Sequence, residues 1–237
     1  MNAIEIRNLK KVYGDKTAVD GLTLDIAQGE FFSLLGVNGA GKTTTIRMLS
    51  CLTPPTSGDA LLLGKSIVRQ PDQVKPLLGV SPQETAVAPN LTVLENLEFM
   101  AGIHGKGNAE QMLDLLGLEP VARQRAKTLS GGWQRRLSIA MGLIGQPEIL
   151  FLDEPTLGLD VLARRELWKV IESLKGRVTV VLTTHYLEEA QALSDRIGIM
   201  AAGSLRAVGT VPELLARTGG SNLEEAFVTL AQGGMQP

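Results

Sequence analysis

The chain has 237 residues and a formal net charge of −2, from 23 Lys and Arg against 25 Asp and Glu. This length can bury a core without staples, and the near balance of charge gives no indication of a nucleic-acid-binding surface. The one cysteine, Cys51, cannot form an internal disulfide, so nothing argues for an oxidising compartment. The charged start at 1–11 and the short apolar run at 31–37 resemble neither a secretory signal nor a membrane span of about 20 residues. We expect a cytosolic chain that does not cross a bilayer.

The first predicted elements are segments of alternating apolar and polar residues at 4–7 and 22–26, a pattern typical of antiparallel strands. Later apolar runs at 30–36, 148–153 and 178–184 are nearly continuous. Strands that are covered on both faces of a parallel sheet have this pattern. We therefore predict a mostly parallel sheet and a separate antiparallel part.

Helical periodicity follows between and after these runs. Apolar residues share one face within 137–144 and within 167–174. Strands and helices together predict an α/β fold in which helices flank the sheet. A Gly-Gly pair at 219–220 loosens the chain, so we predict one domain over 1–218 and a short carboxy-terminal extension at 219–237.

The sequence GVNGAGKT at 36–43 lies between a predicted strand and a predicted helix, and it fits the phosphate-loop pattern. Glycines let backbone N–H groups close on phosphate oxygens, and the following helix presents its positive end. Lys42 adds a mobile cation, and the Thr43 hydroxyl suits Mg2+. The alternative, a chance glycine-rich turn, is disfavoured by the strand and helix on either side. The residues of this loop predicted to bind the nucleotide phosphates are Gly36, Asn38, Gly39, Ala40, Gly41, Lys42, Thr43 and Thr44.

Two carboxylates follow the apolar run at 149–152. Because isolated buried acids are costly, we predict that Asp153 binds Mg2+, directly or through water, and that Glu154 polarises an attacking water. His185 follows the run at 178–184, at the sheet edge where ligands of open α/β folds collect, and is a candidate contact to the γ-phosphate. The alternatives are an acid pair that merely begins a loop and a histidine that belongs to a loop or a helix cap. The predicted catalytic residues are Lys42, Glu154 and His185, and the metal ligands predicted from the residues alone are Thr43 and Asp153.

The sequence LSGGWQRR at 129–136 opens a predicted helix. It resembles the signature sequence of the ATP-binding cassette (ABC) family, and with the phosphate loop, the acid pair and His185 it follows the family order along nearly the whole chain. The resemblance implies a P-loop NTPase core with a mostly parallel sheet flanked by helices, an antiparallel β subdomain and a helical signature subdomain at about 84–145. It also implies an ATPase that uses ATP and Mg2+.

In that family, the signature engages the ATP that is held by the opposite copy, so two cassettes close head to tail around two nucleotides. Here this implies contacts from Ser130, Gly131 and Gly132. From the residues alone, Ser130 can cap the helix while the glycines expose N–H groups, which would make a second anion site. Plain helix capping is the alternative.

Other positions match the family one at a time. Tyr13 matches the aromatic residue that stacks on adenine, and Gln83 the glutamine that contacts magnesium and senses the membrane partner. Asp160 matches the aspartate that couples the two sites. Taken alone, Tyr13 could simply be a packed side chain, Gln83 a solvated loop residue and Asp160 a turn residue. The sequence departs from the family at Trp133 and at Val161, which replaces a frequent proline.

The segments 83–105 and 222–227 are similar to the branch of bacterial exporters that serves drugs, antibiotics, lipids or polysaccharides. This implies separate transmembrane permease subunits that dock near Gln83, a second ATP-binding domain, a place on the cytoplasmic face of the cell membrane and no nucleic-acid partner. A surface helix that docks nothing is the alternative for that segment.

Two other classes of protein are alternatives to a transport ATPase. A soluble cassette ATPase acting on DNA or ribosomes stays open, although such members usually insert a long coiled coil or carry two cassettes, and this sequence has neither. A phosphate-loop kinase or GTPase would leave the signature unexplained, and no Asn-Lys-x-Asp motif occurs.

Overall fold

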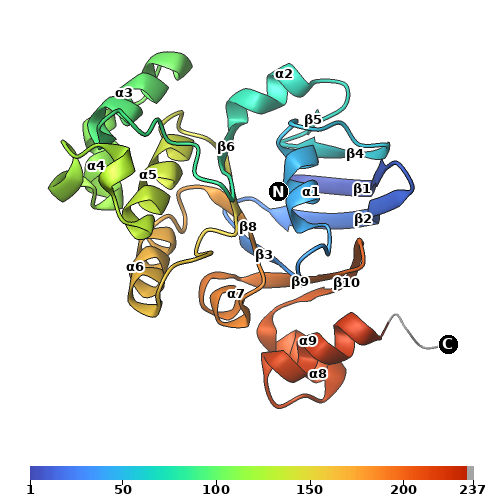
Figure 1. Ribbon diagram of the computed structural model, residues 1–237. Coiled ribbons are helices and arrows are strands. Elements are labelled where there is room, and N and C mark those ends of the chain that lie inside the picture. Colours follow the sequence, from blue (N-terminus) through green and yellow to red (C-terminus); the bar gives the residue numbers. More distant parts are fainter. Residues whose placement is uncertain (234–237) are drawn as a thin grey trace.

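The computed structural model describes residues 1–233, which form two sheets surrounded by helices (Figure 1). One sheet is four-stranded, with the order β2-β1-β4-β5, and the other is six-stranded, with the order β10-β9-β3-β8-β7-β6. The strands are β1 (Asn2–Tyr13), β2 (Lys16–Ala27), β3 (Phe31–Leu35), β4 (Ser57–Leu62), β5 (Lys65–Ser66), β6 (Leu78–Ser81), β7 (Ile149–Asp153), β8 (Thr179–Thr184), β9 (Arg196–Ala201) and β10 (Ser204–Gly209).

The pairing of the strands confirms the predicted sheet. β1 pairs with β2 and β4 in antiparallel fashion, whereas β9, β3, β8, β7 and β6 are parallel neighbours. Only the edge strand β10, among the described strands of this larger sheet, runs antiparallel to its neighbour. The predicted α/β fold with a mostly parallel sheet and a separate antiparallel part is therefore correct.

The three central strands β3, β7 and β8 are buried along their whole length. Successive side chains of a strand point to opposite faces, so Phe31 and Leu150 join the core under the helices, while Phe32 and Phe151 join the core shared with the antiparallel sheet. Burial on both faces explains why these strands are nearly continuous apolar runs in the sequence.

The helices lie in groups around the large sheet. In Figure 1, α3, α4 and α5 form a lobe at the left, and α8 and α9 lie at the bottom, near α7. The predicted helical segments fall in α5 and α6. The helices are α1 (Lys42–Leu49), α2 (Pro71–Val74), α3 (Val93–His104), α4 (Ala109–Leu116), α5 (Gly131–Leu143), α6 (Val161–Glu172), α7 (Leu187–Leu193), α8 (Val211–Thr218) and α9 (Leu223–Gln232), with short 3-10 helices at Lys75–Leu77, Glu119–Val121 and Ala126–Thr128.

Helix α9, in the predicted carboxy-terminal extension, is attached by apolar contacts. Leu223 of this helix is buried with Leu35 and Leu214 in a small core at the edge of the large sheet, and Phe227 packs against it. The last part of the extension, 234–237, lies outside the described residues.

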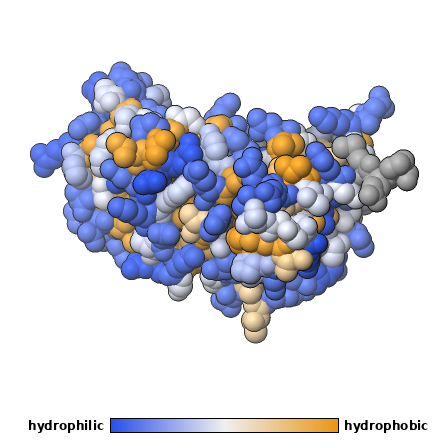
Figure 2. Space-filling model, turned by 90° about the horizontal axis from the view of Figure 1, so that it is seen from below, coloured by the Kyte–Doolittle hydropathy of each residue, from blue (hydrophilic) through white to orange (hydrophobic). Residues whose placement is uncertain are grey.

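The surface is predominantly polar. Figure 2 shows a face that is mostly hydrophilic, with small hydrophobic patches between the polar groups. Within residues 1–233, every helix is too short or too polar to cross a bilayer.

Candidate nucleotide site

A cavity of about 440 Å3 lies beside the phosphate loop. The neighbouring parallel strands β3, β7 and β8 end at this same edge of the sheet, where ligands of open α/β folds bind. The cavity brings together most of the sequence-predicted residues. Those that line it are Tyr13, Asn38, Gly39, Gly41, Lys42, Thr43, Thr44, Gln83, Glu154 and His185.

Glycines shape the phosphate loop. Gly39 and Gly41 have φ angles of 81° and 105°, which side chains other than glycine rarely allow. A Cβ atom on Gly41 would also lie 2.4 Å from the carbonyl oxygen of Ala18. Gly41 is the N-cap of α1, so the free N–H groups and the positive end of this helix face the cavity. Gly36 and Ala40 support the loop and do not line the cavity.

Three charged or titratable side chains meet in the cavity. The Lys42 ammonium lies 3.1 Å from Oε1 of Glu154, and both side chains are 5% exposed. The other oxygen of Glu154, Oε2, is 2.7 Å from Nδ1 of His185. Lys42 also donates to the carbonyl oxygens of Gly36 and Val37, at 2.7 Å and 3.2 Å. The carboxylate therefore has a cation on one side and an imidazole on the other.

A sharp turn at the end of β7 aims the Glu154 side chain at these partners. Glu154 has a φ of 50°, a left-handed conformation that costs energy for a residue with a Cβ and that recurs at active sites. Its N–H donates to the side-chain hydroxyl of Thr183 on the neighbouring strand, at 3.1 Å. Asp153 and Glu154 thus point in different directions although they are adjacent.

Two of the residues predicted to hold Mg2+, Thr43 and Asp153, fit that ion. Asp153 Oδ1 accepts hydrogen bonds from the hydroxyls of Thr43 and Thr183, at 3.1 Å and 2.5 Å. Burial raises the pKa of Asp153, and these two hydroxyls and Lys42 oppose the rise. A bound divalent cation would favour the charged carboxylate. A hydroxyl and a carboxylate at the rim of a phosphate site are typical Mg2+ ligands, with the remaining positions filled by water and phosphate.

A third buried acid, Glu189, lies on the helix that follows His185. Glu189 on α7 is 1% exposed, and its Oε1 accepts a hydrogen bond from Nε1 of Trp168 at 3.2 Å. Burial raises the pKa of Glu189, and the hydroxyls of Thr184 and Thr156 are near enough to oppose the rise. This acid's hydrogen bond to Trp168 joins α7 to α6. Sequence reasoning missed it because a Glu-Glu pair in a helix shows no sign of burial.

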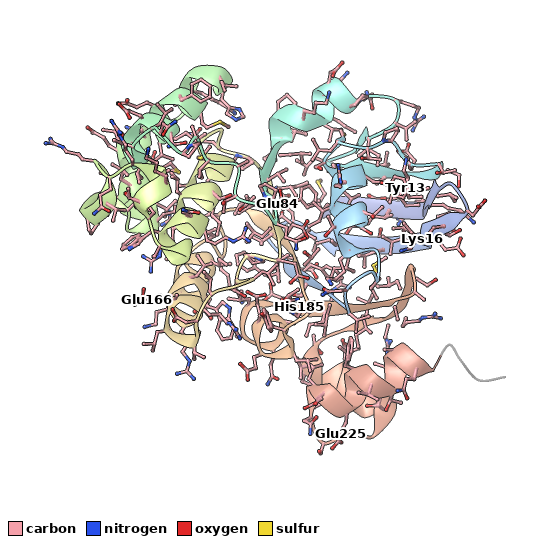
Figure 3. All side chains as sticks on the ribbon, in the orientation of Figure 1. Tyr13, Lys16, Glu84, Glu166, His185 and Glu225 are labelled. Atoms are coloured by element: carbon pink, nitrogen blue, oxygen red, sulfur yellow. The ribbon has the colours of Figure 1, made fainter. Side chains whose placement is uncertain are left out.

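Tyr13 and Lys16 lie on the antiparallel sheet side of the cavity, away from His185 (Figure 3). Tyr13 is 47% exposed, and it pairs with Lys16 across the turn that joins β1 to β2. An exposed aromatic ring in this position is available to stack on a base. Lys16, Ala18 and Leu157 also line the cavity and were not predicted. No sequence motif marks Lys16.

The signature residues Ser130, Gly131 and Gly132, and also Asp160, do not line this cavity. Ser130 occupies the N-cap position of α5, but its side chain makes no capping hydrogen bond. The expectation that it caps the helix is therefore wrong. Because Ser130 is exposed, water or a ligand can satisfy the free amides of the helix start.

The two departures from the family pattern both have a defined place. Trp133 is partly buried against the large core, and the Arg136 guanidinium lies 4.8 Å from the centre of its ring. Val161 is the first residue of α6. This helix is capped by Asp160, whose Oδ1 accepts hydrogen bonds from the N–H groups of Leu162 and Ala163, each at 2.9 Å.

Comparisons with known proteins agree with this geometry. The family model described as ABC transporter matches residues 19–157. The linearmycin resistance ATP-binding protein LnrL of Bacillus subtilis is 40% identical, over 95% of this chain and 75% of LnrL. The daunorubicin resistance ATP-binding protein DrrA3 of Streptomyces coeruleorubidus is 43% identical, over 94% of this chain and 72% of DrrA3.

Solved structures of ABC cassettes have the same fold. An ATP-binding subunit of an ABC transporter superposes with a TM-score of 0.85 at 27% identity, covering 96% of this chain and 99% of that one. The dimeric cassette MJ0796 superposes with a TM-score of 0.79 at 28% identity, covering 87% and 98%. A further structure of MJ0796 is a post-hydrolysis state bound to ADP and phosphate. The chain is therefore an ATPase and belongs to the ABC transporter family of ATP-binding proteins.

Proposed function

We propose that this ATPase powers export of a substrate through separate membrane subunits, on the cytoplasmic face of the cell membrane. The names of its relatives support an exporter, because they include resistance proteins for linearmycin and daunorubicin and a Nod factor export protein of Cupriavidus metallidurans. The predicted branch of drug, antibiotic, lipid and polysaccharide exporters agrees with these names.

One observation carries the proposal of a paired mechanism: the signature residues lie outside the nucleotide cavity of their own chain. The exposed amino end of α5, at Ser130 and Gly131, is a second anion site with no phosphate loop beside it. A second cassette facing head to tail would supply that loop, and MJ0796 has been solved as a dimer. Each chain would then contribute half of each of two ATP sites.

In the proposed reaction, the free amides at the start of α1 and the Lys42 ammonium bind the phosphates. Glu154 orients a water and accepts its proton, and His185 holds the other oxygen of that carboxylate, as the 2.7 Å contact places it. General-base catalysis of this kind typically contributes about a hundred- to ten-thousand-fold. Mg2+, when held by Thr43 and Asp153 with Gln83 nearby, would neutralise phosphate charge.

The test for hydrolysis replaces Glu154 by Gln, which keeps the shape and removes the proton acceptor. We expect Glu154→Gln to slow turnover of MgATP by at least about a hundredfold while leaving ATP binding intact, and to accumulate an ATP-dependent dimer in gel filtration. Glu148→Gln is the matched control, because Glu148 is exposed and precedes the opposite end of the same strand. Turnover at the wild-type rate in Glu154→Gln would remove that residue from its role.

The test for export is the partner that the chain selects. With its cognate permease present, we expect the chain to sediment with membranes and to show faster ATP turnover than the isolated chain. Recovery with ribosomes or DNA, and none with membranes, would instead favour a soluble cassette ATPase.

A further inference from the structure

Arg135 is a buried arginine on the signature helix α5 that reaches the segment carrying Gln83. It is 7% exposed, and its Nη1 donates to the carbonyl oxygen of Pro82 at 2.9 Å. Its Nη2 donates to the carbonyl oxygen of Gln83 itself. Among the ion pairs of residues 1–233, none involves Arg135. The planar guanidinium therefore donates hydrogen bonds to two successive backbone carbonyls.

Further contacts join the same face of α5 to β6. One turn after Arg135, the Ser138 hydroxyl is 2.8 Å from that of Ser81, and both are buried. A further turn along, a Cβ atom on Gly79 would lie 2.2 Å from the carbonyl oxygen of Gly142, so the two backbones are in close contact. Residues spaced three to four apart share one face of a helix, and this face holds the strand and the residues that follow it.

Gln83 depends on contacts from α5 because its own segment does little to fix its position. The side chain is exposed and lines the nucleotide cavity from a segment without helix or strand structure. Figure 3 marks this segment by its neighbour Glu84, between the helical lobe and the rest of the molecule. Backbone anchoring is thus the available way to fix where Gln83 points.

The cost of burying Arg135 also calls for a reason. A buried cation is expensive unless its donors are satisfied. Burial lowers the pKa of Arg135, and the nearby carboxylates of Asp153 and Glu154 raise it. The guanidinium therefore lies within the electrostatic reach of the acid pair of the cavity, as well as in contact with the Gln83 backbone.

We propose that Arg135 is a positioning residue that holds Gln83 at the nucleotide cavity and ties it to the signature helix. The proposal rests on the proposed function, in which Gln83 faces the magnesium nucleotide. Because α5 also begins with the exposed signature, the position of Gln83 at one ATP and that of Ser130 toward the other ATP are then linked through a single side chain. A lysine is a poor replacement for this arginine, since its one ammonium nitrogen would have to stand in for two nitrogens, Nη1 and Nη2, that each meet a different carbonyl.

A double-mutant cycle tests whether Arg135 acts through Gln83. We expect Arg135→Lys and Gln83→Ala each to lower kcat for MgATP by about tenfold or more, as for loss of a charge-assisted hydrogen bond, and to raise the Mg2+ concentration needed for half-maximal turnover. The double variant should be no more than about twofold slower than Gln83→Ala, because coupled residues are not additive. Effects that multiply in the double variant, or wild-type kinetics in Arg135→Lys, would overturn the proposal.

A second measurement needs neither nucleotide nor activity. A glutamate-specific protease should cleave the full chain after the exposed Glu84 faster in Arg135→Lys than in the wild type. Arg136→Lys is the matched control, because the next residue on the helix contacts Glu166 at 3.0 Å instead and should leave cleavage after Glu84 unchanged. Equal cleavage rates in Arg135→Lys and wild type contradict the positioning role. A wild-type chain without turnover would defeat the proposed function, and the cleavage rate alone would then decide on Arg135.

Discussion

Removing the Lys42 ammonium should destabilise the chain even when no nucleotide is present. In the structure its nearest acid is Glu154, with 3.1 Å between Nζ and Oε1 and 5% exposure on both sides. At an effective dielectric constant near 20, this separation corresponds to an attraction of about 5 kcal/mol. Breaking one partner of a buried pair typically costs about 3–5 kcal/mol, because the other charge stays buried. We expect Lys42→Met to lower the free energy of unfolding by a comparable amount.

The assay is urea unfolding of the nucleotide-free chain, with titration calorimetry of MgATP to follow binding. Lys75→Met is the matched control, since Lys75 lies at the same 3.1 Å from Asp72 but on the surface, with 55% and 91% exposure. An exposed pair contributes about 0–1 kcal/mol. Adding Glu154→Gln to Lys42→Met should recover part of the stability and none of the binding. If Lys42→Met and Lys75→Met unfold at the same urea concentration, the buried pair does not contribute as reasoned.

Three further predictions concern stability. Burial raises the pKa of Glu189 above its ordinary 4.5, so the folded chain binds this proton more tightly, and that stabilisation is lost as the pH rises from about 4.5 through the folded-state pKa. The melting temperature of Glu189→Gln relative to the wild type should therefore increase across that window in thermal unfolding. Val161→Pro should raise the free energy of unfolding by about 0.4–1 kcal/mol, since proline suits the first position of a helix. Leu162→Pro should lower it, because it removes the 2.9 Å capping bond from the Leu162 N–H to Asp160. Chemical unfolding measures both changes. Gly79→Ala places a Cβ 2.2 Å from a backbone oxygen of α5 and should lower the free energy of unfolding measured in urea. Gly102→Ala, in open space inside α3, should raise this free energy by about 0.5–1 kcal/mol.

Local patterns were sufficient for the elements that form the sheet edge. The strand before the phosphate loop is apolar except for Ser33, and the strand that ends at Asp153 is apolar up to that residue, because both faces of each strand are buried. Such runs are visible in the sequence. The glycines of the loop are also recognisable in the sequence. The position of Gly41 has a positive φ and leaves no space for a Cβ, so it requires glycine. These features depend on neighbours in the chain.

Features that depend on strand register or on distant contacts were not visible. Lys16 enters the cavity only because it pairs with Tyr13 across a turn, and no motif marks it. The burial of Glu189 and the hydrogen bond from Arg135 to the Gln83 carbonyl both arise where separate elements pack together. Ser130 is the opposite case. Its residue type predicts a helix cap, whereas its exposed hydroxyl makes no capping hydrogen bond.

The contacts of Lys42 also indicate when Glu154 becomes able to act. In the structure, the ammonium contacts Oε1 of this carboxylate and two loop carbonyls. The phosphates of ATP carry several negative charges and would lie at the same helix start, so they would compete with the carboxylate for that ammonium. We therefore expect nucleotide binding to weaken the contact between Lys42 and Glu154. Oε1 would then be available to accept a proton from water, while the 2.7 Å contact with His185 holds the other oxygen.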